Sequence, residues 1–106
     1  MEEGKEEDNS IEQEENNIVY IGEKPFMNYV SSVDILFSLK NQEDVIIRAR
    51  GKFINRAVDV AEVSKKRGSG DKEIYVKDIK INSEKFENKE RKIINVSTIE
   101  IILAKR

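Results

Sequence analysis

The spacing of apolar residues alternates between the period of a strand and that of a helix along residues 17–106, and this order restricts the fold more than any other feature. Residues 17–21 (NIVYI) are β-branched and aromatic and precede a glycine, which predicts a short buried strand. Residues 45–50 (VIIRAR) become alternating toward their end, as in a strand with one solvent-facing side. The alternating segments 73–81 and 94–103 predict two further strands.

Two segments between the first three strands have helical spacing. From Phe26 to about Lys40, apolar residues recur every three or four positions, and Pro25 suits the first turn of that helix. A second amphipathic helix runs to about Lys66, and the glycines of residues 67–71 (RGSGD) end it; its apolar face holds Ile54, Ala57, Val58 and Ala61. The predicted order is therefore βαβαββ.

The last two strands change the phase of their alternation midway. Ile74 and Val76 are out of step with Ile79 and Ile81, and a similar slip separates residues 94–96 from residues 99–103. In an antiparallel hairpin, this pattern predicts a bulge or a strongly twisted arm that projects beyond the sheet. We expect the charged residues 82–92 to be the loop between the strands.

Length and composition exclude several classes of protein. A chain of 106 residues predicts one domain, and it has no Cys, so no disulfide framework is possible. Without Cys or His, neither a Ser-His-Asp triad nor the usual zinc site can form. No apolar run approaches the roughly 20 residues of a membrane span, and no leader is visible, so we expect a soluble, cytoplasmic protein.

Catalysis is not expected either. The carboxylates Asp34, Asp59 and Glu62 fall on predicted helices without a recognisable metal or nucleophile arrangement. The sequence predicts no enzyme, no metal site and no cofactor.

The net charge of −2 hides two oppositely charged parts. Residues 1–16 contain eight acidic residues and one lysine, a net charge of −7, and we expect them to be a disordered acidic tail. The other 18 Lys and Arg and 13 Asp and Glu give residues 17–106 a charge of +5. The tail either aids solubility or competes with an anionic ligand for this basic domain.

The predicted strand-to-helix turns hold the strongest candidates for phosphate contacts. Lys24 lies at the first helix N-terminus, beside free N–H groups and the positive end of the dipole, and Gly22 would allow close backbone approach. Residues 49–52 (ARGK) repeat this chemistry. If the two turns share an edge, the cationic residues converge there: Lys24, Arg48, Arg50, Lys52 and Arg56. The alternative is a scattered set of solvated side chains.

The charged end of the hairpin supplies a second set of candidates, namely Lys80, Lys85, Lys89, Arg91 and Lys92. Glu84, Glu87 and Glu90 lie among them, so an ordinary solvated loop is the alternative. Phe86 could wedge into a groove or partner, or make only an incidental apolar contact.

Three segments together resemble the Alba family of small archaeal chromatin proteins: IGEKPFMNYV, VIIRARGKFINRAVDVAE and VSTIEIILAKR, within residues 17–106. The resemblance implies an α+β fold, a βαβαββ two-layer sandwich with a long β-hairpin arm. It also implies a homodimer, or a heterodimer with a paralogue, that binds double-stranded DNA and RNA without sequence preference and compacts or protects the chromosome. Lys24, Arg50 and Lys52 match the family's phosphate-contacting positions, and Asn28 and Tyr29 belong to the same motif.

Two positions depart from the family pattern. Glu23 replaces a lysine whose acetylation is associated with weaker binding, and Gly68 replaces a phenylalanine that packs one dimer on the next. Regulation by acetylation and cooperative coating are therefore open. Two other functions also stay open: a mainly RNA-binding protein, and a basic-faced module that docks an acidic protein.

Overall fold

The computed structural model describes residues 17–106, and the predicted acidic tail of residues 1–16 lies outside this range. The elements follow the predicted βαβαββ order: β2 (Ile18–Tyr20), α1 (Phe26–Ser38), β3 (Asp44–Arg50), a 3-10 turn η2 (Gly51–Phe53), α2 (Ile54–Arg67), β4 (Ile74–Glu87) and β5 (Ile93–Lys105).

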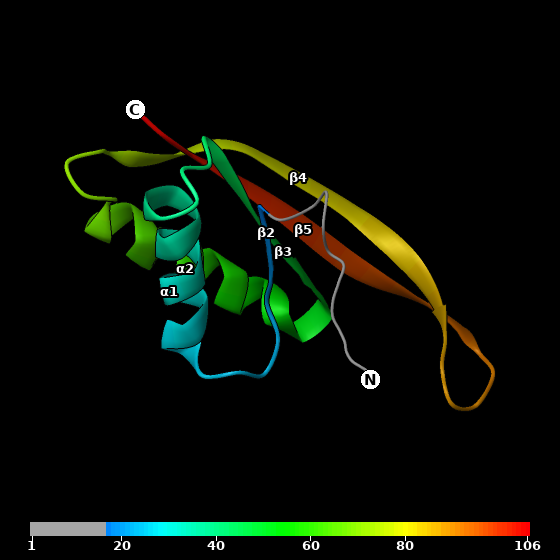
Figure 1. Cartoon of the computed structure of the whole chain (residues 1–106). Coiled ribbons are helices and arrows are strands. Elements are labelled where there is room, and N and C mark those ends of the chain that lie inside the picture. The colour runs from blue at the N-terminus through cyan, green and yellow to red at the C-terminus, as the bar shows by residue number, and fades with distance from the viewer. Residues whose placement is uncertain (1–16) are drawn as a thin grey trace.

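The strands form one mixed sheet in the order β2-β3-β5-β4. Strand β2 pairs with β3 in parallel, and β5 pairs antiparallel with both β3 and β4. Both helices lie on the same side of the sheet (Figure 1), which confirms the predicted α+β two-layer sandwich. Within residues 17–106, the other face of the sheet carries no helix, and we call it the helix-free face.

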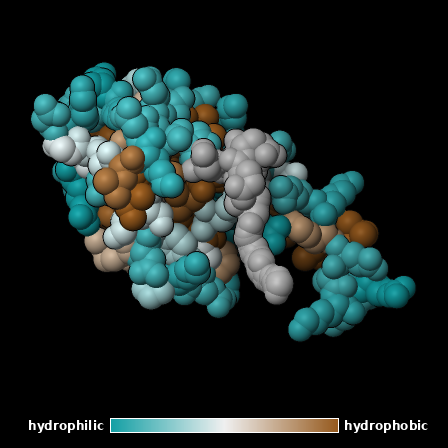
Figure 2. Space-filling model, in the orientation of Figure 1, coloured by the Kyte–Doolittle hydropathy of each residue, from teal (hydrophilic) through white to brown (hydrophobic). Residues whose placement is uncertain are grey.

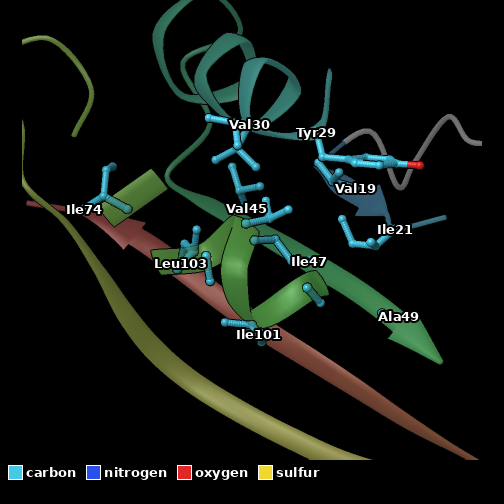
Figure 3. Close-up of a cluster of buried hydrophobic side chains, with 14 of the residues drawn as sticks. Val19, Ile21, Tyr29, Val30, Val45, Ile47, Ala49, Ile74, Ile101 and Leu103 are labelled. Carbon is cyan, nitrogen blue, oxygen red and sulfur yellow. The ribbon is translucent and has the colours of Figure 1, made fainter. Parts of the chain in front are cut away.

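The core fills the space between the helices and the sheet. Val45 and Ile47 of β3 and Leu103 of β5 are completely buried, and Val30 of α1 is only 1% exposed. Figure 3 shows Val30 and Val45 pointing toward each other across the two layers. Full burial of one such aliphatic side chain stabilises a fold by about 1.5–3 kcal/mol, so this cluster holds the layers together.

The helix boundaries differ slightly from prediction. Pro25 is the N-cap of α1 with extended backbone (ψ 143°), so the proline precedes the first turn instead of lying in it. Helix α1 ends at Ser38, two residues early, and α2 ends at Arg67, followed by the C-cap residue Gly68 with φ 66° and ψ −166°. A Cβ on Gly68 would lie 2.9 Å from the carbonyl oxygen of Lys72. This conformation is essentially restricted to glycine, which explains why no side chain occupies this site.

The hairpin is longer than predicted. Pairing continues to Glu87 opposite Ile93, so residues 82–87 are strand, and the prediction of a loop was wrong for these residues. Both faces of this part of the arm are exposed to solvent, so its side chains carry no apolar alternation, yet the backbones still pair. The true turn covers residues 88–92, where the Asn88 side chain accepts hydrogen bonds from two backbone N–H groups. The arm projects well beyond the helices (Figure 1).

The predicted bulge is present, but only in β4, where the register shifts between Val76 and Asp78. Strand β5 pairs without a shift. Its phase change has another cause: Ile99 and Ile101 point into the core, whereas Ile94 and Val96 lie on the helix-free face of the arm. Apolar residues change sides there because the helices no longer cover the arm.

Candidate nucleic-acid interface

The two strand-to-helix turns meet at one edge of the sheet. Parallel neighbours β2 and β3 both end there, so the turns that follow them are adjacent. The Lys52 ammonium lies 3.8 Å from the Glu23 carboxylate, and Arg56 Nη2 donates a 2.8 Å hydrogen bond to the carbonyl oxygen of Lys24. The structure thus brings together the turns that carry Lys24 and Lys52, and we call this region the basic edge.

Tyr29 organises the first turn from inside. Its ring is 6% exposed, and its hydroxyl oxygen accepts hydrogen bonds of 2.9 Å from the N–H groups of both Gly22 and Lys24. A Cβ on Gly22 would lie 3.5 Å from this hydroxyl, which is an ordinary van der Waals contact, so Gly22 lies directly beside Tyr29. Two N–H groups expected to face phosphate are therefore occupied, and Tyr29 is a positioning residue.

Arg56 also supports the turn. Arg56 donates a hydrogen bond to the Lys24 carbonyl, and its guanidinium also lies 5.8 Å from the centre of the Tyr29 ring. These two contacts join α2 to the first turn. The Nε atom of Arg56 is buried and has no hydrogen-bond partner within residues 17–106. Buried donors normally find a partner, and this atom is closed to a phosphate because almost none of its surface is accessible.

Arg48 lies on the helix-free face, as its alternation with Ile47 and Ala49 predicts. Its Nε is 2.5 Å from the Glu100 carboxylate, and its Nη1 donates a 3.1 Å hydrogen bond to the Tyr20 hydroxyl. Burial lowers the pKa of Arg48, but the hydrogen bond to Glu100 and the charge of that carboxylate raise it by more, so the net pKa lies above its usual value. Arg48 is consequently a permanently charged residue engaged within the sheet.

Arg50 connects the body of the protein to the hairpin arm. Its guanidinium carbon lies 4.5 Å from the centre of the Phe86 ring, and Nη1 is 3.8 Å from the Glu84 carboxylate. The side chain remains 61% exposed. Sequence reasoning left the role of Phe86 open and missed Glu84 as a partner, because the β4 bulge sets which arm residues reach β3.

The other candidates are exposed but spread along the structure. Asn28 lies on α1, beside the first turn. Lys80 and Lys85 lie on different faces of β4. In the pairing with β5, Lys80 is the partner of Glu100 and Lys85 is the partner of Asn95. The remaining three are in the arm turn: Lys89, Arg91 and Lys92. The arm carries this second basic group away from the basic edge.

Carboxylates oppose several of the cationic candidates, which the sequence did not indicate. Glu23 faces Lys52, Glu84 faces Arg50, and Glu100 faces Arg48. The first two pairs are exposed and 3.8 Å apart, and such pairs contribute about 0–1 kcal/mol. A phosphate can therefore replace either carboxylate at small cost.

Within residues 17–106, no group of three or more Asp or Glu side chains is placed to hold a metal ion. Over the same range, neither helix combines the length and the apolar character needed to cross a membrane.

Comparisons with known proteins agree with this architecture. A family model described as Alba matches residues 17–83. The DNA/RNA-binding protein Alba of Methanococcus maripaludis is 48% identical over 89 residues, which are 84% of this chain and 98% of that protein. Alba 1 of Archaeoglobus fulgidus, also named a DNA/RNA-binding protein, is 50% identical over 90 residues, 85% of this chain and 97% of its own.

Solved structures show the same similarity. Alba from Thermoplasma volcanium superposes with a TM-score of 0.74 at 41% identity, covering 83% of this chain and 99% of its own. ALBA1 from Trypanosoma brucei superposes with a TM-score of 0.67 at 25% identity, and the match covers 85% of this chain and 69% of that chain. With the family model matching more than half of its residues, the chain belongs to the Alba family.

Proposed function

We propose that this protein binds double-stranded DNA and RNA through their phosphates, without reading base sequence. The observation that carries the proposal is the convergence of the two basic turns at the basic edge, where Arg56 is hydrogen-bonded to the first turn and Lys52 lies 3.8 Å from Glu23. The names of the relatives, DNA/RNA-binding proteins, support the same ligand class.

The mechanism is neutralisation of phosphates by side chains on a rigid edge. Lys24 and Lys52 act as compact charges, and Arg50 offers a planar fork that can hold two phosphate oxygens. Binding releases counterions, so the logarithm of affinity falls with the logarithm of salt concentration by about 0.9 for each phosphate contact on a DNA duplex. Selectivity comes from groove shape, since the converged residues at this edge are mainly cationic.

We further propose that the binding unit is a homodimer. A paralogous subunit could take the place of one copy and form a heterodimer through the same interface. Ile79 and Ile81 lie on the helix-side face of β4, where no helix of residues 17–106 covers them, and are 54% and 79% exposed. Val58 on α2 is 40% exposed. In Figure 2, hydrophobic side chains are visible on the arm among hydrophilic ones. A second copy that covers these residues removes apolar surface from water.

A dimer carries two basic edges and two arms, which suits compaction or protection of a chromosome and a location on the nucleoid in the cytoplasm.

Two other functions compete with this one. An A-form helix can also occupy a shape-reading surface, which would make RNA the main ligand. An acidic protein, or the acidic residues 1–16, could occupy the basic edge instead.

A salt titration of binding tests the proposal, using one DNA duplex and one RNA duplex of matched length. For Lys24→Ala combined with Arg50→Ala, we expect weaker binding and a salt slope shallower by about 0.9 for each phosphate that the variant no longer neutralises. Lys65→Ala combined with Arg67→Ala is the control, since it removes the same charge from the far end of α2. Equal changes in both double variants would contradict a specific phosphate site, and no binding of wild-type protein at low salt would favour an acidic protein partner.

A further inference from the structure

The helix-free face of the sheet carries an aromatic and polar surface of which the proposed duplex mechanism uses only Arg50. Val19, Ile47 and Ile101 point into the core, so their neighbours along each strand point to the opposite face. Tyr20 is opposite Arg48, and Arg48 is opposite Glu100. Beyond them, Arg50, Glu84 and Phe86 lie on the same face. We call this set the aromatic face: Tyr20, Arg48, Arg50, Glu84, Phe86 and Glu100.

The aromatic face contains two similar units. Arg48 lies 5.8 Å from the centre of the Tyr20 ring and pairs with Glu100. Arg50 lies 4.5 Å from the Phe86 ring and is near Glu84. The two arginines are two residues apart on β3, roughly 7 Å along the strand. In each unit, an arginine guanidinium lies next to an aromatic ring and also contacts a glutamate carboxylate.

The charge balance of this surface argues against a duplex as its ligand. Two arginines are offset by two glutamates, so the set has no net positive charge, whereas a duplex presents a continuous row of phosphates. A single strand also carries phosphates, but its unpaired bases are neutral and expose flat faces, which a duplex does not offer. Aromatic rings stack on any base, and arginine and glutamate offer donors and acceptors to the polar edges of bases.

The shape of the surface also suits a ligand of this kind. A hollow of about 720 Å³ lies beside Tyr20, and its lining includes Arg48, Arg50 and Glu84 of the aromatic face together with Phe53 and Ile99, but not Phe86. Tyr20 is 59% exposed beside it. Small-ligand sites commonly have volumes of about 300–1,000 Å³, so there is room for at least one base.

We propose that the aromatic face binds single-stranded nucleic acid by stacking bases on Tyr20 and Phe86. This site shares Arg50 with the residues proposed for duplexes, but neither Tyr20 nor Phe86 belongs to that set. The protein would then stack unpaired bases on residues that a duplex does not need.

The test compares a single-stranded RNA of about eight nucleotides, within the usual site size of sequence-tolerant binders, with a DNA duplex. We expect Tyr20→Ala and Phe86→Ala each to weaken single-strand binding by about 5- to 100-fold, the effect typical of one stacked base. For Tyr20→Ala, duplex affinity should change less than about twofold, well below that effect. Tyr75→Ala is the matched control, since Tyr75 also packs on an arginine, 4.1 Å from Arg106, but opposite Ala104 at the far end of β5.

A spectroscopic measurement separates stacking from a merely structural effect. The chain has no Trp, so Phe86→Trp introduces a single tryptophan whose fluorescence can be excited apart from that of the three tyrosines. We expect this variant to retain single-strand binding and its fluorescence to be quenched by the single strand. Full single-strand affinity in both alanine variants, or equal weakening for single strand and duplex, would overturn the proposal. Failure of the duplex mechanism would be visible separately, as absent duplex binding by the wild-type protein.

Discussion

The guanidinium carbon of Arg50 lies 4.5 Å from the centre of the Phe86 ring, although the two residues are on different parts of the structure, the body and the arm. The same guanidinium lies 3.8 Å from Glu84. A residue whose position matches a phosphate contact is therefore already engaged with the arm in the free protein. In the proposed duplex mechanism, a phosphate on Arg50 would compete with Glu84, and this competition would link ligand binding to the position of the arm.

Replacing Glu84 with Gln removes this competitor. We expect Glu84→Gln to raise duplex affinity about two- to fivefold at low salt, because exposed ion pairs contribute about 0.2–1 kcal/mol. Glu87→Gln removes the same charge from the same strand on its opposite face and is the control. An equal gain in the control would show that net charge alone is responsible.

Glu23 lies 3.8 Å from Lys52, so in the proposed mechanism it would compete with phosphate for this lysine. We expect Glu23→Lys to increase duplex affinity at moderate salt and to steepen the salt slope by about 0.9 if the new lysine gains one phosphate contact. Glu62→Lys on α2, where Glu62 pairs with Lys65, is the matched control. Unchanged affinity in Glu23→Lys would exclude Glu23 as a modulator of binding.

The hydroxyl of Tyr29 supports the first turn through two hydrogen bonds. We expect Tyr29→Phe to lower the free energy of unfolding by about 1–3 kcal/mol, because two backbone N–H groups lose their acceptor. Urea denaturation measures the change. Tyr75→Phe is the control and should have a smaller effect, and equal destabilisation of the two variants would contradict the role of this hydroxyl.

Gly68 ends α2 in a conformation essentially restricted to glycine. We expect Gly68→Ala to destabilise the protein by about 1–3 kcal/mol from backbone strain, with a further penalty from the 2.9 Å approach to the Lys72 carbonyl. Gly70 has φ 59° but nothing within 4 Å of an added Cβ. Gly70→Ala should therefore cost less in thermal denaturation, and the reverse order would contradict this account.

The exposed isoleucines of β4 support the proposed dimer. We expect Ile81→Glu to shift the protein toward monomers in sedimentation equilibrium, because the interface would have to bury an unpaired carboxylate. Ile35→Glu is the control, since it makes the same change on α1, where Ile35 is 42% exposed. A dimer unaffected by Ile81→Glu would place the interface elsewhere.

The sequence predicted the conformation of residues wherever one face of an element is buried. Residues 26–38 and 54–67 kept a helical apolar period, since one side of each helix packs on the sheet. The motif around Lys24 identified the correct turn and the correct family. The same reasoning failed over residues 82–87, because a strand exposed on both faces has no apolar alternation to mark it.

The pairings within the candidate site depend on tertiary structure for a different reason. Arg48 meets Glu100 and Arg50 meets Glu84 across 52 and 34 positions of the chain, and the pairing of β3 with β5 and of β5 with β4 decides which residues meet. A single extra residue at the β4 bulge sets that register for the arm. Periodicity and short motifs thus determine the elements and the positions of the basic turns, because both are local properties. Which carboxylate faces each arginine, and whether Tyr29 meets a ligand or the turn itself, follows only from the folded arrangement.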